Sequence, residues 1–312
     1  MCNIWKHKRK DFLSVDVYKK LPSSLEMIDI TGGEPFLRPD IPELIAVLHK
    51  KCPKARLLIT TNGFLHDKIK KQIDSILAID PHTAFRVSLD GIGKMHERIR
   101  GVPGAYGKAL KTLKILEKAG VKDIGVIFTL MAQNTEEMRR IYAFSKKHRY
   151  NFSLNVIHDS PVYFGEGKTS LRPELETIKQ DIDAIARDQM LSLNPKIVVK
   201  GWFNSKIQKH LQNHVRPLPC GAGENFFYMD PGANIYMCHL KNFPIGNLNT
   251  SSFQDIWTSR TKQKLLSKTQ ACQDCWLMCT TRDEIKRKRF YLTKDIMKLL
   301  FQAILKIRCL ML

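Results

Sequence analysis

Three things are scarce in this sequence: long apolar runs, acidic residues and cysteines. No uninterrupted apolar stretch reaches the roughly 18–20 residues that a membrane-spanning helix needs, and the polar, basic start lacks the apolar segment of a secretory signal. Only 30 Asp and Glu stand against 51 Lys and Arg, and the net charge of +21 favours anionic partners or serves only solubility. Eight cysteines in 312 residues are too few for a disulfide scaffold. We therefore expect a cytoplasmic protein with a basic surface.

The first half of the chain alternates short apolar runs with longer amphipathic ones. The apolar runs predict strands at 26–30, 55–60, 85–89, 123–131 and 151–157. The amphipathic stretches predict helices at 41–51, 66–79, 106–120 and 134–148, the last with Asn134 as its N-cap, and then at 172–190 and 201–214. Strands and helices that alternate with short connections predict an α/β fold, with a parallel sheet and helices packed outside it.

Glycines and polar residues follow three consecutive predicted strands. The first strand is followed by Gly32, Gly33 and Glu34, the second by Thr61 and Asn62, and the third by Ser88 and Asp90. A single glycine after a strand indicates an ordinary turn. The carboxyl ends of parallel strands meet at one edge of the sheet, however, where such folds build their active sites. Three such loops in succession therefore predict a ligand site at that edge.

The second half of the chain carries a cluster of cysteines. The cluster consists of Cys220, Cys238, Cys272, Cys275 and Cys279, whereas Cys2, Cys52 and Cys309 stand apart. Residues 225–238 predict a hairpin around a Pro-Gly turn, and the surrounding sequence has little periodicity, which indicates a small domain held by metal. Thiolates at C-x2-C-x3-C spacing converge on structural zinc or on an iron–sulfur cluster. His239 is either a further ligand or an ordinary buried polar residue.

Four motifs together resemble the radical S-adenosylmethionine (SAM) enzymes with a SPASM or twitch-type extension. They are TGGEP at 31–35, TTNG at 60–63, SLDG at 88–91 with a later His and Arg-Gly, and a late module with CGAG, IGNL and C-x2-C-x3-C. The resemblance covers nearly the whole chain. It implies a partial (β/α)6 TIM-like barrel without its first strand over 1–195, a small iron–sulfur domain over 196–283 and a basic amphipathic helix over 284–312.

In that family a 4Fe–4S cluster and SAM generate a 5′-deoxyadenosyl radical, which abstracts a hydrogen atom from the substrate. The resemblance implies that SAM is bound by Gly32, Gly33, Glu34, Thr61, Asn62, Ser88, Asp90, Arg100 and Thr129. It places the first three at the methionine amino group, and Ser88 and Asp90 near the ribose. It assigns one auxiliary 4Fe–4S cluster to four of the five late cysteines and leaves open which one is spare. A barrel suits this chemistry because the radical must be shielded from water.

The start of the chain departs from the family pattern. The family's radical-generating cluster is held by three cysteines spaced C-x3-C-x2-C, and Cys2 of MCNIWK matches only the third. Cys52 lies at a predicted helix end on the wrong side of the barrel, and Cys309 lies in the tail. One thiolate cannot hold that cluster, so we expect an N-terminally truncated chain that does not generate the radical as it stands.

The tail at 285–312 is basic at its start and apolar on one helical face. That face carries Ile296, Leu299, Leu300, Ala303, Ile304 and Ile307. It suits an anionic membrane surface, or a docked position on the protein itself or on a partner.

The resemblance implies a peptide or small-molecule substrate, phosphorylated and glycan-linked ones included, and a reductant such as a flavodoxin or ferredoxin. Two other functions stay open. One is a zinc-ribbon protein that binds nucleic acid, against which the strand-end motifs count. The other is an inactive fragment that only binds a partner.

Overall fold

The computed structural model describes residues 12–160 and 171–310, with side chains as far as 299 and at 301. It divides into two compact units. The barrel unit comprises the chain up to Arg172 together with Tyr228–Lys262, and the helical unit comprises Pro173–Phe227 together with the chain from Gln263 onward. This division follows contacts in space, so the predicted domain limits at 195 and 283 stay predictions. Cys2 and the side chains of Leu300, Ala303, Ile304, Ile307 and Cys309 lie outside the described residues.

Five parallel strands form the sheet of the barrel unit. They are β1 (Met27–Ile30), β2 (Arg56–Thr61), β3 (Ala84–Ser88), β4 (Ile124–Leu130) and β5 (Asn151–Val156), and they pair in sequence order. All five predicted strands are confirmed. Because every connection joins adjacent parallel strands, the crossovers run over one face and the sheet curls into an open barrel. The predicted partial TIM-like barrel is thus confirmed.

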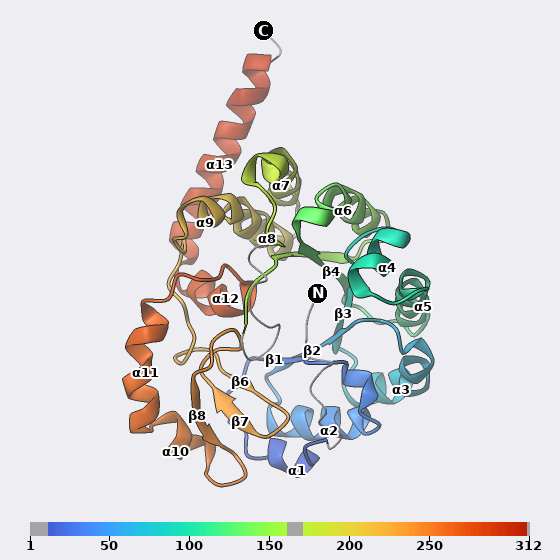
Figure 1. Cartoon of the computed structure of the whole chain (residues 1–312), viewed down its shortest axis with the longest axis vertical. Helices are drawn as coiled ribbons and strands as arrows, with labels where there is room; N and C mark the ends of the chain where they lie inside the picture. Colours follow the sequence, from blue (N-terminus) through green and yellow to red (C-terminus); the bar gives the residue numbers. More distant parts are fainter. Residues whose placement is uncertain (1–11, 161–170, 311–312) are drawn as a thin grey trace. The chain divides into compact units, whose positions relative to one another are not determined.

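Four helices of the barrel unit, α2 (Ile41–Lys51), α3 (His66–Ile79), α5 (Ala105–Lys118) and α6 (Glu137–Lys147), surround the outer face of this sheet (Figure 1). Two short helices pack on them, α1 (Val15–Tyr18) on α2 and α4 (Lys94–Arg100) on α5, and the unit also has 3-10 turns η2 (Pro35–Leu37) and η3 (Ala132–Asn134). The apolar positions of the four outer helices recur every three or four residues, as Ile69, Ile73 and Ile76 do in α3, and all three are buried. On the strands, alternate residues such as Ile59 and Phe128 are fully buried. This core holds the strand ends in place.

Near the strand-end loops, two helices of the barrel unit differ from the prediction. Helix α4 was not expected, because its seven residues are too few for a periodic signal; Gly93 (φ 55°) and Gly101 (φ 67°) bound it. The helix expected from 134 begins at Glu137, and Asn134 is not its N-cap but ends η3. The Asn134 side chain instead forms hydrogen bonds with backbone groups of the strand-end loops.

A small antiparallel sheet completes the barrel unit. It consists of β6 (Tyr228–Met229), β7 (Asn234–Tyr236) and β8 (Pro244–Asn247). The expected hairpin is confirmed as β6 and β7, and β8 adds a third strand to it. In the turn between β6 and β7, Asp230 Oδ1 accepts from the backbone N–H groups of Gly232 and Asn234. Helix α10 (Phe253–Trp257) follows, and Ser252 caps it by accepting from the Asp255 backbone N–H. This helix packs closely against β8, since a Cβ built at Gly246 would lie only 2.7 Å from Ile256 Cγ1. A glycine is needed there.

The helical unit contains α7 (Leu175–Met190), α8 (Pro195–Ser205), α9 (Ile207–Asn213), α12 (Met278–Arg287) and α13 (Arg289–Leu310), with α11 (Arg260–Gln270) entering it. The prediction of one helix over 201–214 is wrong, because the chain breaks into α8 and α9. Ser205 Oγ donates to the Trp202 carbonyl, and Lys206 N bonds to the Phe203 carbonyl three residues back. The last turn of α8 therefore tightens and ends there.

The tail differs from the prediction at its start, because α12 ends at Arg287 and α13 begins at Arg289. In the first turns of α13, Leu292 is buried, and Asp295 pairs with Lys206 Nζ at 2.5 Å and accepts from Trp202 Nε1 at 2.7 Å. This part of the tail is docked within its own unit. Within the described ranges, no helix is both long and apolar enough to cross a bilayer. Association with a membrane surface stays a prediction.

Candidate active site

The loop after β1 borders open space. Gly32 has a φ of 131°, in the region that strains residues with a side chain. Among the residues that the structure describes, a Cβ built at Gly32 or Gly33 would meet no atom within 4 Å. A ligand can therefore approach this backbone closely, as expected for the predicted methionine end of SAM.

Glu34 ties this loop to the end of β2. Its Oε1 accepts from Thr61 Oγ1 at 2.7 Å, and its Oε2 accepts from the Asn62 backbone N–H at 2.7 Å. Burial raises the pKa of Glu34 above its ordinary value, while these hydrogen bonds and the Arg100 charge act in the opposite direction. The carboxylate is thus held in a fixed orientation at the strand edge. Its contact with a ligand amino group stays a prediction.

Asp90, at the end of β3, is fully buried and joins two other predicted residues. Its Oδ1 accepts from the Thr129 backbone N–H at 2.9 Å, and its Oδ2 pairs with Arg100 Nη2 at 2.6 Å. Arg100 also acts on the charge of Glu34, so its guanidinium lies near both carboxylates. Its Nε is buried and has no hydrogen-bond partner among the residues that the structure describes. Asp90 therefore holds Arg100 in place, while the buried Nε of Arg100 has no hydrogen-bond partner in the described part of the chain.

Asn134 and His96 support this arrangement, although the sequence suggested only a helix cap for Asn134 and no specific role for His96. Asn134 Nδ2 donates to the carbonyls of Asp90 and Thr129, both at 3.0 Å, and its Oδ1 accepts from the Met131 backbone N–H. His96 Nδ1 accepts from the Asp90 backbone N–H at 3.0 Å. These bonds fix the ends of β3 and β4 relative to each other.

His96 makes stability depend on pH. Burial lowers its pKa from 6.5 to about 4, because the interior disfavours the charged imidazolium. The stabilisation is complete above the unfolded pKa of 6.5 and is lost as pH falls towards 4, by up to about 3 kcal/mol. His96→Asn keeps an acceptor for Asp90 N but does not titrate. Urea unfolding between pH 7 and 4 should therefore show a smaller loss of the free energy of unfolding in this variant than in the wild type. An equal dependence on pH in both proteins would contradict the role given to His96.

The concave face of the sheet is lined by half-buried polar residues. Ser88 and Thr129, both predicted, have hydroxyls without a hydrogen-bond partner in the described part of the chain. On β5, half-buried Ser153 and Asn155 alternate with buried apolar residues, and Asn155 lies opposite Thr129 in the register. These two β5 residues were missed, although the alternation in NFSLNV could have identified them. The face offers polar groups to a ligand on three strands.

The late cysteines fall in both units. Cys238 belongs to the barrel unit, where its Sγ accepts from the Leu240 backbone N–H at 3.3 Å. Cys220, Cys272, Cys275 and Cys279 belong to the helical unit. Within residues 12–160 and 171–310, no three Cys, His, Asp or Glu side chains are close enough together to hold a metal ion. Burial lowers the pKa of His239 to about 4, which keeps its imidazole neutral.

Backbone contacts nevertheless bring the cysteine loops of the helical unit together. The N–H of Gly221, beside Cys220, bonds to the carbonyl of Thr280, beside Cys279, at 3.1 Å. Cys275 Sγ accepts from a guanidinium at 3.2 Å. Thiols on adjoining loops, with a cation beside them, suit an anionic iron–sulfur cluster. Cys52, by contrast, is a buried thiol at the end of α2 that bonds to the Pro22 carbonyl, as its predicted position implied.

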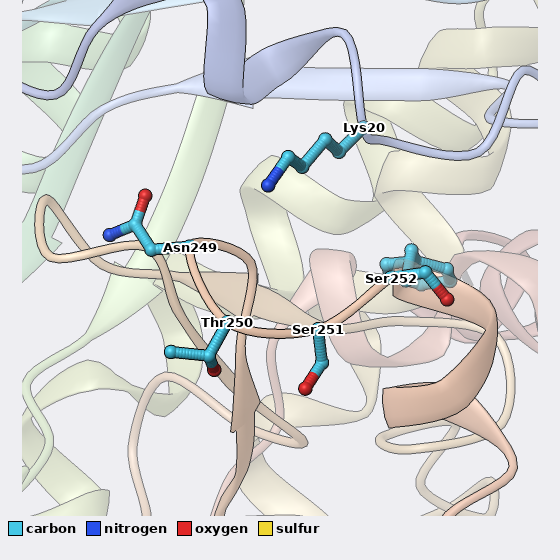
Figure 2. A pocket seen from close by; sticks show the side chains of 6 residues that line it. Lys20, Asn249, Thr250, Ser251 and Ser252 are labelled. Carbon is cyan, nitrogen blue, oxygen red and sulfur yellow. The ribbon is translucent and has the colours of Figure 1, made fainter.

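A pocket in the barrel unit lies apart from the predicted site residues, none of which lines it. Figure 2 shows Lys20 facing the loop of Asn249, Thr250, Ser251 and Ser252. Lys20 Nζ donates to the Leu248 carbonyl at 2.7 Å, and the lining side chains named here are exposed. The candidate site is therefore the strand edge and not this pocket.

Two family models match the chain. The radical SAM superfamily model matches residues 2–145, and the SPASM model, described as an iron–sulfur cluster-binding domain, matches residues 220–276. Of the two metals left open by the cysteine spacing, the second match supports iron–sulfur. The two domains imply SAM and 4Fe–4S clusters, including an auxiliary cluster, as the cofactors.

Three curated relatives resemble different shares of the chain. Fe-coproporphyrin III synthase of Methanosarcina barkeri is 31% identical over 51% of this chain and 38% of its own length. The antilisterial bacteriocin subtilosin biosynthesis protein AlbA of Bacillus subtilis is 25% identical over 81% of this chain and 54% of its own length. The mycofactocin maturase MftC of Mycobacterium tuberculosis is 25% identical over 80% of this chain and 62% of its own length. The chain thus spans less than two thirds of the length of these relatives.

Among solved structures, SuiB of Streptococcus suis bound to the precursor peptide SuiA has a TM-score of 0.60 at 17% identity, covering 90% of this chain and 66% of SuiB. This likeness is one of fold. The two model matches show that the chain contains a radical SAM domain over residues 2–145 and an iron–sulfur domain of the SPASM type over residues 220–276.

Proposed function

We propose that this chain binds SAM at the carboxyl ends of β1 to β4 and takes part in modifying a peptide. The arrangement of Arg100 carries the proposal. Its guanidinium is held by the buried carboxylate of Asp90 and lies near Glu34, and its buried Nε has no partner among the described residues. A guanidinium so placed suits the carboxylate of an amino-acid ligand.

The site residues fit the different parts of SAM. The backbone at Gly32 and Gly33 leaves room for the methionine end. Ser88 and Thr129 offer hydroxyls at the strand edge, where a ribose can donate and accept hydrogen bonds. When bound with a reduced iron–sulfur cluster, SAM supplies the one-electron chemistry that removes a hydrogen atom from the substrate. The chain's own part is to orient SAM and to exclude water from it.

A peptide is the substrate class that the relatives favour. AlbA and MftC are named for bacteriocin biosynthesis and mycofactocin maturation, and SuiB has been solved with the precursor peptide SuiA. The polar concave face with Ser153 and Asn155 suits a peptide backbone, which needs donors and acceptors along its length. A flavodoxin or ferredoxin is the proposed reductant. The auxiliary cluster, held by cysteines of the late module, is proposed to accept an electron during the reaction.

A glycine variant tests the SAM site. In Gly33→Val, the new side chain occupies the open space beside the backbone, and we expect SAM to bind at least about tenfold more weakly, a loss of about 1.4 kcal/mol. Equilibrium dialysis with labelled SAM on the anaerobically reconstituted protein measures this. Gly107→Val in α5 is the matched control, because its Cβ also meets no atom within 4 Å. Equal SAM affinity in wild type and Gly33→Val would overturn the proposed site.

A further inference from the structure

A buried arginine contacts one of the late cysteines. Arg216 is 6% exposed, and its Nη1 donates to Cys275 Sγ at 3.2 Å and to the Cys275 carbonyl. Its Nη2 donates to Thr280 Oγ1 at 3.2 Å, and its Nε donates to the Leu218 carbonyl at 3.2 Å. Its backbone N–H donates to the side chain of Gln273, beside Cys272. One residue therefore binds groups next to three cysteines of the helical unit.

The guanidinium has no carboxylate partner in the described part of the chain, since its acceptors are carbonyls, a hydroxyl and a sulfur. A buried cation is costly when no anion compensates it. The hydrogen bonds satisfy its donors but supply no negative charge. An iron–sulfur cluster with thiolate ligands would supply that charge where Cys275 lies.

An aromatic ring also lies beside Arg216. Its Cζ lies 5.8 Å from the ring centroid of Trp276, and that ring stacks on Phe203 with centroids 4.7 Å apart. Trp276 Nε1 donates to the Phe203 carbonyl at 2.9 Å, which fixes the stack. Arg216 is buried, so its charge acts on its neighbours in a medium of low dielectric constant.

We propose that Arg216 is a positioning residue that tunes the auxiliary cluster. Its positive charge and its N–H···S bond to Cys275 stabilise the more negative, reduced form of the cluster and so raise its reduction potential. The inference rests on the proposed function only in that the late cysteines hold an iron–sulfur cluster. It makes no assumption about the peptide or about SAM.

Redox titration followed by electron paramagnetic resonance tests the proposal on the full, anaerobically reconstituted chain. In Arg216→Gln, the ratio of oxidised to reduced cluster at a fixed potential should rise at least about tenfold, equal to about 59 mV for a one-electron couple. Arg216→Lys keeps the charge but not every hydrogen bond of the guanidinium, so it should recover about half of this shift and leave the ratio about threefold above that of the wild type. Arg287→Gln, which removes an exposed charge from α12, is the matched control and should leave the potential unchanged.

Each outcome decides the proposal. An Arg216→Gln cluster with the wild-type potential would overturn it, as would an equal shift in Arg287→Gln. If Arg216→Gln does not retain iron, Arg216→Lys decides. A single ammonium cannot keep all the guanidinium bonds, so a shift of about threefold in the ratio supports the proposal and no shift refutes it. Zinc in place of iron in the wild-type chain would refute the cluster itself. That result can be distinguished from a failure of the Arg216 proposal, because metal analysis of the wild-type chain is done before any variant is measured.

Discussion

Asp90→Asn should lower the free energy of unfolding by about 3 kcal/mol, because it leaves the guanidinium of Arg100 without its buried counter-charge. Asparagine keeps the shape of the side chain and can still accept from the Thr129 backbone N–H. The loss therefore reports the charge pair rather than the strand contact. Since Arg100 is proposed to bind the SAM carboxylate, SAM affinity should fall by at least about tenfold in the same variant. Urea unfolding and equilibrium dialysis measure the two effects.

An exposed ion pair in the same unit provides the control. Asp16 and Lys19 are 71% and 62% exposed, so Asp16→Asn should change stability by less than about 1 kcal/mol. Adding Arg100→Met to Asp90→Asn should cost less than the sum of the single variants, by at least about 1 kcal/mol. Strictly additive effects would show that the two side chains are not coupled.

Replacing Cys220 or Cys275 by alanine should remove at least about half of the iron bound by the late module, on the prediction that both are among the four ligands. Both side chains are buried in the helical unit, and the loss of one of four thiolate ligands weakens the hold on a 4Fe–4S cluster. Iron and acid-labile sulfide per chain after anaerobic reconstitution, together with visible absorption, measure the loss.

Cys52→Ser is the matched control for these variants. Cys52 is also fully buried, but its thiol bonds to the Pro22 carbonyl, and a serine hydroxyl can keep that bond. Its iron content should equal that of the wild type. Iron lost equally in all three variants would indicate a general folding defect and would contradict the assignment of the late cysteines.

The strands and the site loops were predictable because their signals are local. Each strand is a short run with apolar residues on its buried face, and each is followed within a few residues by its polar or glycine loop. Gly32, Glu34, Asn62, Ser88 and Asp90 were identified in this way. The sequence does not show which of these side chains meet. The pairing of Asp90 with Arg100 depends on α4, a seven-residue helix between glycines that carries no periodic pattern.

The residues that were missed act over long distances in the sequence. Asn134 resembled a helix cap, yet it binds the carbonyl of Asp90, 44 positions earlier. Arg216 contacts Cys275 across 59 positions and Thr280 across 64. Such contacts leave no local pattern, because they arise only when tertiary packing brings separate loops together. The break between α8 and α9 was missed because it depends on a serine that bonds to its own helix.

Metal analysis of the chain isolated anaerobically tests the central claim most directly, namely that an iron–sulfur module accompanies the strand-edge site. We predict about four irons per chain at the late cysteines, with matching sulfide and the broad visible absorption of a thiolate-bound cluster. Stoichiometric zinc without that absorption would contradict the account.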